Sequence, residues 1–235
     1  MFGFMYYYDP TYILVIIGVL ISLWASINVN ATFSKYAKVR SNCGLTGAEV
    51  AERILRNNGI YDVTIERVSG NLSDHYNPST KVLALSDSTY NKTSIAAISV
   101  AAHECGHAVQ HATGYFPLSF RSALVPIANF GSYAAWLFII IGLLFSGSSS
   151  VMWINIGLLC FGFAVLFQIV TLPVEFNASA RALKAMETGG IVGADENRQA
   201  RKVLFAAALT YVAAALSAIL QLLRLIILFG GKNRD

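Results

Sequence analysis

Four long apolar stretches constrain the fold of this chain more than any other feature of its sequence. They cover residues 12–29, 123–145, 151–172 and 203–229. A helix needs about 20 predominantly apolar residues to cross the hydrocarbon core of a bilayer, and each stretch is close to that length. Only 13% of the residues are charged, which is too few to cover a soluble globule of this size. We therefore expect an integral membrane protein with about four transmembrane helices.

Basic residues predict how the chain is threaded through the lipid bilayer. None precedes the first apolar stretch, and five follow it: Lys35, Lys38, Arg40, Arg53 and Arg56. Cytoplasmic loops carry an excess of Lys and Arg. An anchor over residues 1–30 therefore places residues 31–122 in the cytoplasm. A transmembrane hairpin over residues 123–172 returns residues 173–202 to the same side, so the two polar segments can build one site.

The last segment, residues 203–235, is predicted to be a further transmembrane helix. Gln221 and Arg224 interrupt its apolar stretch, and Arg224 could either snorkel near a helix end or face the bundle. The net charge of +4 is modest, and no basic run carries interleaved aromatic residues, so nucleic acid is not an expected partner. The cysteines Cys43, Cys105 and Cys160 form no paired framework, which is typical of a chain facing a reducing compartment.

The polar segment after the first stretch has the pattern of a small α+β region. Thr46 and Glu49 form a capping box for a helix that ends at Gly59. A second helix is expected to begin after Thr93 or Ser94 and to run to about residue 113. Residues 62–68 and 81–85 are predicted strands, and residues 70–78 a turn-rich loop. The expected fold class is a mainly α membrane protein with a small α+β, zincin-like cytoplasmic region.

The second of these helices contains the motif His103-Glu104-Cys105-Gly106-His107. Residues four positions apart lie on one helical face, so both imidazoles can bind one Zn²⁺. Glu104 projects to one side of the pair, where it can take a proton from water on the metal. Burying these groups in an apolar helix is costly unless a metal or partners satisfy them. This cost favours a metal site over a surface helix with accidental histidines.

A catalytic zinc usually has three protein ligands, so a third ligand is expected. His111 lies on the same helical face as His103 and His107. It is about 12 Å along the helix axis from His103, which is too far for both to bind one ion. It is expected beside the site or at the helix end. Glu175 follows Pro173, which is suited to beginning a helix on the side of the membrane that holds the motif. Glu175 is the better candidate, and the alternative is a carboxylate that stabilises a helix N-terminus.

The motif followed by Glu175-Phe176-Asn177-Ala178 resembles membrane metallopeptidases with a downstream glutamate ligand, the gluzincin arrangement. These include the prenyl-protein peptidases and the bacterial heat-shock membrane peptidases. The chain is more similar to a bacterial family of membrane proteins called putative neutral zinc metallopeptidases. The resembling stretches are residues 74–78, 81–87, 96–110, 172–182 and 201–215.

This resemblance implies one Zn²⁺ held by His103, His107 and Glu175, with Glu104 as the catalytic base. The predicted location is a bacterial inner (plasma) membrane, and the positive-inside rule makes the active site face the cytoplasm. One residue departs from the broader group, which commonly has an aspartate where this chain has Ser179. An aspartate could orient a metal-binding histidine. A serine would do so only weakly, and the alternative is that Asn177 takes over this role.

The resulting hypothesis is a membrane-embedded zinc metallopeptidase that acts on a peptide or protein substrate, which could itself be a membrane protein. The strand over residues 81–85 is either a free edge that pairs with substrate or an ordinary core strand. Two rival hypotheses are a non-catalytic zinc-binding assembly or scaffold protein and a transporter. A structural zinc site needs no base such as Glu104, and transport sites lie near the bilayer midplane. Candidates for the donor that stabilises the oxyanion are His75, Tyr76, Arg181 and Tyr211.

Overall fold

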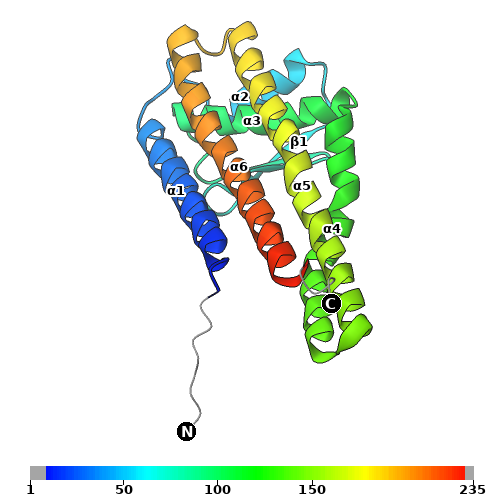
Figure 1. Ribbon diagram of the computed structural model, residues 1–235. Helices are drawn as coiled ribbons and strands as arrows, with labels where there is room; N and C mark the ends of the chain where they lie inside the picture. Colours follow the sequence, from blue (N-terminus) through cyan, green and yellow to red (C-terminus); the bar gives the residue numbers. More distant parts are fainter. Residues whose placement is uncertain (1–8, 231–235) are drawn as a thin grey trace. The chain divides into compact units, whose positions relative to one another are not determined.

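Helices make up most of the structure, a computed structural model that describes residues 9–230. The outer ends of the predicted first and last segments, residues 1–8 and 231–235, lie outside the described residues. In chain order the elements are α1 (Tyr12–Tyr36), α2 (Gly47–Asn57), β1 (Thr64–Val68), β2 (His75–Asn77), β3 (Val82–Ser86), α3 (Ile95–Ala112), α4 (Phe116–Leu144), α5 (Gly147–Thr188) and α6 (Ala194–Gly230) (Figure 1).

Within residues 9–230, the helices α1, α4, α5 and α6 are long and apolar enough to cross a membrane. In α1, for example, only 11% of the most apolar part is buried by the chain itself. Large apolar side chains left exposed along such a helix are suited to contact with lipid. The prediction of a mainly α membrane protein with about four spans and a small α+β region is confirmed.

The chain divides into two compact units. One contains Ala123–Ile169 and the two ends of the chain, up to Trp24 and from Val212 onward. The other contains Ala25–Ser122 and Val170–Tyr211, and it holds the whole sheet and the motif helix.

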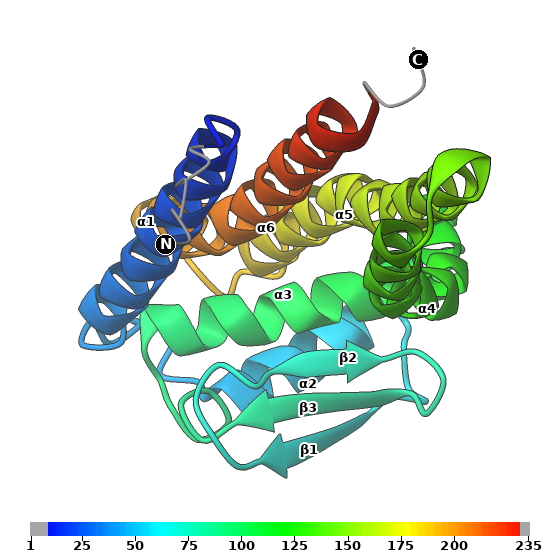
Figure 2. The same cartoon turned by 60° about the horizontal axis from the view of Figure 1, so that its bottom comes forward.

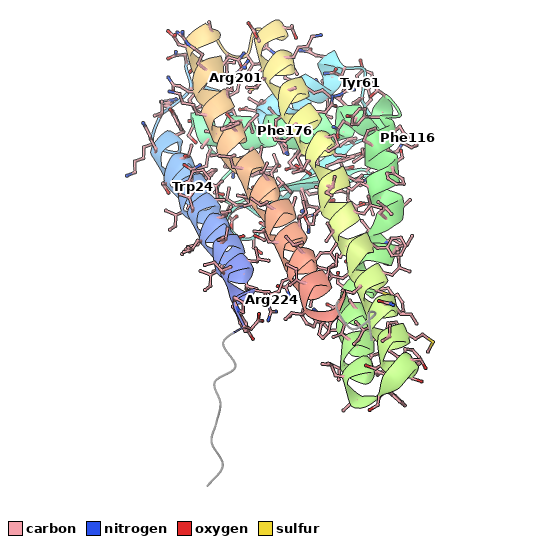
Figure 3. The ribbon with its side chains drawn as sticks, in the orientation of Figure 1. Trp24, Tyr61, Phe116, Phe176, Arg201 and Arg224 are labelled. Carbon is pink, nitrogen blue, oxygen red and sulfur yellow. The ribbon has the colours of Figure 1, made fainter. Side chains whose placement is uncertain are left out.

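In the first unit, α1 and α6 are joined by polar contacts between small residues and by one ion pair. The Ser217 hydroxyl donates to the carbonyl of Gly18 at 2.9 Å. At the far end of α6, Arg224 pairs with Asp9 at 3.0 Å, and its guanidinium lies 4.2 Å from the centre of the Tyr12 ring (Figure 3). Arg224 therefore faces a neighbouring helix of its own unit and is neutralised there.

The second unit contains a three-stranded sheet in the order β1-β3-β2. Strand β3 pairs with β1 in parallel and with β2 antiparallel, so that Leu83 lies opposite both Ile65 and Tyr76. Figure 2 shows the three strands side by side, with α3 running next to β2. Of the two alternatives for the strand at residues 81–85, the core strand is confirmed. The free edge is wrong, because β3 is paired on both sides.

Strand β2 lies inside the segment that the sequence predicts as a turn-rich loop, so that prediction is wrong at residues 75–77. Three residues are too few to show a strand period, and the strand exists because its backbone pairs with β3. Asp74 fastens the segment by accepting hydrogen bonds from the backbone and the hydroxyl of Ser86, both at 2.8 Å.

Both predicted caps are present in the second unit. Thr46 and Glu49 form the capping box of α2, and the hydroxyl of Ser94 accepts a hydrogen bond from the backbone of Ala97 at the start of α3. Almost the whole of α3 is buried, as its apolar sequence predicts. Cys105 is fully buried and its thiol faces the carbonyl of Ala51, so it is a packing residue.

The expectation that Pro173 begins a new helix is wrong. Helix α5 continues through it as one element from Gly147 to Thr188 (Figure 1). Proline removes one backbone hydrogen bond but is tolerated within long membrane helices, where neighbouring groups satisfy the freed carbonyl. Glu175 therefore stands in the interior of a helix, where it has no N-terminus to stabilise.

Candidate metal centre

His103 and His107 occupy the same face of α3, one helical turn apart, and their rings meet edge to face with centroids 4.8 Å apart. Glu175 approaches them from α5, 72 residues further along the chain than His103. One of its oxygens, Oε2, lies 3.2 Å from Nε2 of His103 and 3.5 Å from Nε2 of His107. All three side chains are largely buried, and Glu175 is 2% exposed.

The spacing of these ligand atoms fits one zinc ion. Two atoms that each lie about 2.0–2.1 Å from a tetrahedral zinc are about 3.4 Å apart, close to the two distances above. The candidate ligand atoms of His103, His107 and Glu175 all lie within 4.8 Å of one another, the one such group among the described residues. Two imidazole nitrogens and a carboxylate oxygen are also a donor set that zinc accepts.

The two imidazoles are oriented by hydrogen bonds to their outer nitrogens. The Nδ1 atom of His103 lies 3.1 Å from the hydroxyl of Ser179. The Nδ1 atom of His107 lies 3.0 Å from the side-chain oxygen of Gln110. Ser179 therefore does contact a histidine, although it stands where the broader peptidase group has an aspartate. In both rings, Nε2 is the atom that faces Glu175.

Arg121 also contacts the site, and sequence reasoning missed it. Its guanidinium donates to Oε1 of Glu175 at 2.7 Å, so the two carboxylate oxygens have different roles. One oxygen faces the histidines and the other pairs with the arginine. Arg121 lies near the start of α4, and no local pattern links it to a residue 54 positions away. Gln110 was also missed, although its place one turn after His107 was a usable signal.

Glu104 lies in the same helix as the histidines and is 8% exposed. Burial raises the pKa of Glu104 to about 7, while the nearby His103 acts in the opposite direction. A general base works best with a pKa near the operating pH. The environment of Glu104 therefore suits proton transfer.

The other predicted residues lie at varying distances from this centre. His111, in the last turn of α3, accepts or donates a hydrogen bond with the Tyr76 hydroxyl at 2.9 Å and belongs to no ligand group. His75 is exposed and bonds to the carbonyl of Ser73. Arg181 donates to Asn177 and lies over the ring of Tyr115. These three are placed in local contacts.

Tyr211 is the remaining candidate for oxyanion stabilisation. It belongs to α6 and is close enough to Glu175 and Glu104 to interact with both electrostatically. Of the four candidates, Tyr211 is the one that interacts directly with Glu175, a candidate ligand of the centre.

Comparisons with known proteins identify a family. The model of a family described as "Putative neutral zinc metallopeptidase" matches residues 11–230. The chain is 47% identical over 216 residues to "Putative membrane protease YugP" of Bacillus subtilis (strain 168). That alignment covers 92% of this chain and 95% of the relative. No solved structure matches the chain.

Proposed function

The chain belongs to the family described as putative neutral zinc metallopeptidases, and we propose that it hydrolyses peptide bonds at the centre formed by His103, His107 and Glu175. The observation that carries this proposal is the convergence of three ligand atoms at zinc spacing beside the buried carboxylate of Glu104. The Bacillus subtilis relative carries the name "Putative membrane protease YugP", which supports the same activity.

Each residue has a distinct task in this mechanism. His103, His107 and Glu175 would hold the ion as its three protein ligands. When bound, zinc supplies a Lewis acid that polarises the scissile carbonyl and lowers the pKa of a coordinated water. Glu104 accepts the proton of the attacking water and delivers it to the leaving amine. Arg121 holds the second oxygen of Glu175 and so fixes the carboxylate.

The substrate in this proposal is an extended peptide that pairs with the sheet. Because β3 is central, only β1 and β2 have a free side. Strand β2 packs against α3, the helix that carries the motif, so its free side is the better place for a peptide. Pairing through backbone hydrogen bonds would give affinity for an extended segment with little dependence on sequence.

The proposed location is the bacterial inner membrane, with the centre facing the cytoplasm. The basic residues that follow α1 support this orientation through the positive-inside rule. A membrane-impermeant thiol reagent applied to intact cells tests it through Cys43, which is partly exposed in the unit that holds the centre. Labelling only after the membrane is opened supports the cytoplasmic side, and labelling of intact cells places the centre outside.

The activity itself is tested by metal analysis and a peptide-library cleavage assay on detergent-purified protein. Wild type should contain one zinc and cleave, and Glu104→Gln should contain one zinc and not cleave. Glu66→Gln, an exposed carboxylate of β1, is the matched control and should behave as wild type. Cleavage that survives Glu104→Gln would remove Glu104 as the base. Zinc in both proteins without cleavage would favour the rival reading, a zinc-binding scaffold.

A further inference from the structure

Gln110 is fully buried in α3, and every polar atom of its side chain has a partner. Its oxygen Oε1 lies 3.0 Å from Nδ1 of His107. Its nitrogen Nε2 donates to the backbone carbonyl of Val174 at 2.8 Å and to Oδ1 of Asn177 at 3.0 Å. A buried amide with all its hydrogen bonds made has one orientation, because rotation would leave polar groups unsatisfied.

Two groups in this network of hydrogen bonds can act in only one way: the Val174 carbonyl, which contacts Gln110, and the Arg181 guanidinium, which contacts Asn177. A backbone carbonyl only accepts, so the Gln110 atom that faces Val174 must be the amide nitrogen. A guanidinium only donates, and Arg181 Nε donates to Oδ1 of Asn177 at 2.7 Å. The Asn177 atom shared by Arg181 and Gln110 is therefore its oxygen.

With the amide of Gln110 fixed in this way, its oxygen must face His107. The His107 nitrogen nearest that oxygen, Nδ1, must then carry the proton. The proton-free nitrogen is Nε2, which is the atom that lies 3.5 Å from the Glu175 carboxylate. Neutral imidazole with a free Nε2 is the form that binds a metal.

The geometry points to Gln110 as a positioning residue that fixes the tautomer and the ring orientation of His107, with Val174 and Asn177 together fixing the amide of Gln110. This inference rests on the part of the proposed function that makes His107 a metal ligand. It does not depend on the reaction. Removing the partner of a ligand histidine typically costs 10- to 100-fold in metal affinity.

The test measures zinc affinity by competition with a chelating dye, on purified full-length protein in detergent. Gln110→Met keeps the length of the side chain and removes both polar atoms. We expect it to weaken zinc binding by about 10- to 100-fold and to change the visible absorption spectrum of the cobalt-substituted protein. That spectrum reports ligand geometry, so a merely structural role would not move it.

Asn177 supplies a matched pair of variants. Asn177→Asp keeps the oxygen that accepts from Gln110 and Arg181, so zinc affinity and the cobalt spectrum should stay close to wild type. Asn177→Leu removes that oxygen and should weaken zinc binding in the same direction as Gln110→Met. Ser99→Ala, which removes another buried polar group of α3, should leave zinc affinity unchanged.

Unchanged zinc affinity and an unchanged cobalt spectrum in Gln110→Met would overturn the inference. An equal loss in all four variants, Ser99→Ala included, would also overturn it, since it would reflect general loosening of α3. Both readouts need no substrate. A protein whose zinc affinity responds as expected but which cleaves no peptide would therefore refute the proposed activity and leave the role of Gln110 standing.

Discussion

Gly106 of α3 lies directly against the backbone of Ala178 in α5: a Cβ atom at position 106 would stand 2.4 Å from the Ala178 carbonyl oxygen. The two helices therefore cross in backbone contact, at the level of the candidate metal centre. The crossing brings Glu175 and Ser179, which flank Ala178, within reach of His103. A residue with no side chain thus determines whether the third ligand reaches the first two.

Gly106→Ala is expected to weaken zinc binding and to lower the melting temperature. In an exposed helix interior, replacing Gly by Ala usually stabilises a protein by about 1 kcal/mol. At position 106 the clash with the Ala178 backbone makes the same replacement destabilising. The measurements are thermal unfolding and zinc competition. Gly162→Ala is the control, because nothing lies within 4 Å of a Cβ atom there and α5 should tolerate it. Two variants with equal melting temperatures would contradict the crossing.

Arg121→Gln is expected to destabilise the chelated protein more than the zinc-loaded protein. Arg121 is the cation that pairs with the buried Glu175 carboxylate, and breaking a buried pair costs about 3–5 kcal/mol. Because the Arg121 side chain is 25% exposed, we expect a smaller loss of about 1–3 kcal/mol. Zinc also neutralises the Glu175 carboxylate. The difference in melting temperature between the zinc-loaded and the chelated protein should therefore be larger in Arg121→Gln than in wild type. A difference equal to that of wild type would show that Arg121 does not neutralise Glu175.

Ser179→Asp is expected to tighten zinc binding. The Ser179 hydroxyl contacts Nδ1 of His103 at 3.1 Å. A carboxylate there would accept a stronger hydrogen bond from the ring N–H and make Nε2 a more basic ligand for the metal. We expect a gain of about tenfold, and a loss of similar size in Ser179→Ala. Zinc competition measures both. If the two variants shift the affinity in the same direction, the contact is not what orients His103.

Glu104→Gln is expected to stabilise the metal-chelated protein at alkaline pH and much less at acid pH. Burial raises the pKa of Glu104 from 4.5 to about 7 in the folded protein. Below pH 4.5 Glu104 is protonated in both the folded and the unfolded chain, so its ionisation does not lower the free energy of unfolding there. As the pH rises toward 7, Glu104 loses its proton first in the unfolded chain. The free energy of unfolding of wild type therefore falls by roughly 3 kcal/mol, whereas that of the glutamine variant does not.

The measurement for Glu104 is the difference in melting temperature between the two chelated proteins, from pH 4.5 to pH 8.5. Taking the difference cancels the titration of groups that do not interact with Glu104. Glu66→Gln again serves as the control, since this exposed side chain should give a small and flat difference. A difference between wild type and Glu104→Gln that does not grow with pH would contradict the burial of an ionisable Glu104.

The sequence by itself determined the features that depend on residues close together in the chain. Four apolar stretches of sufficient length predicted the long helices, because the thickness of a bilayer sets the length of a span. The capping patterns at Thr46 and at Thr93 or Ser94 predicted where two helices begin, and the structure has Thr46 and Ser94 as the caps. The spacing of His103 and His107 predicted that their rings share a face, since helical geometry alone places residues four positions apart together.

Only the tertiary structure decided which distant residues meet that pair. The sequence offered Glu175 as a candidate ligand. Its approach to the histidines, its pairing with Arg121 and the contact of Ser179 with His103 depend on the crossing of α3 with α5, which leaves no periodic signal in the sequence. Strand β2 escaped prediction for the same reason, since three residues form a strand only when a partner is present. Pro173 was misjudged because a local rule ends a helix where membrane packing allows it to continue.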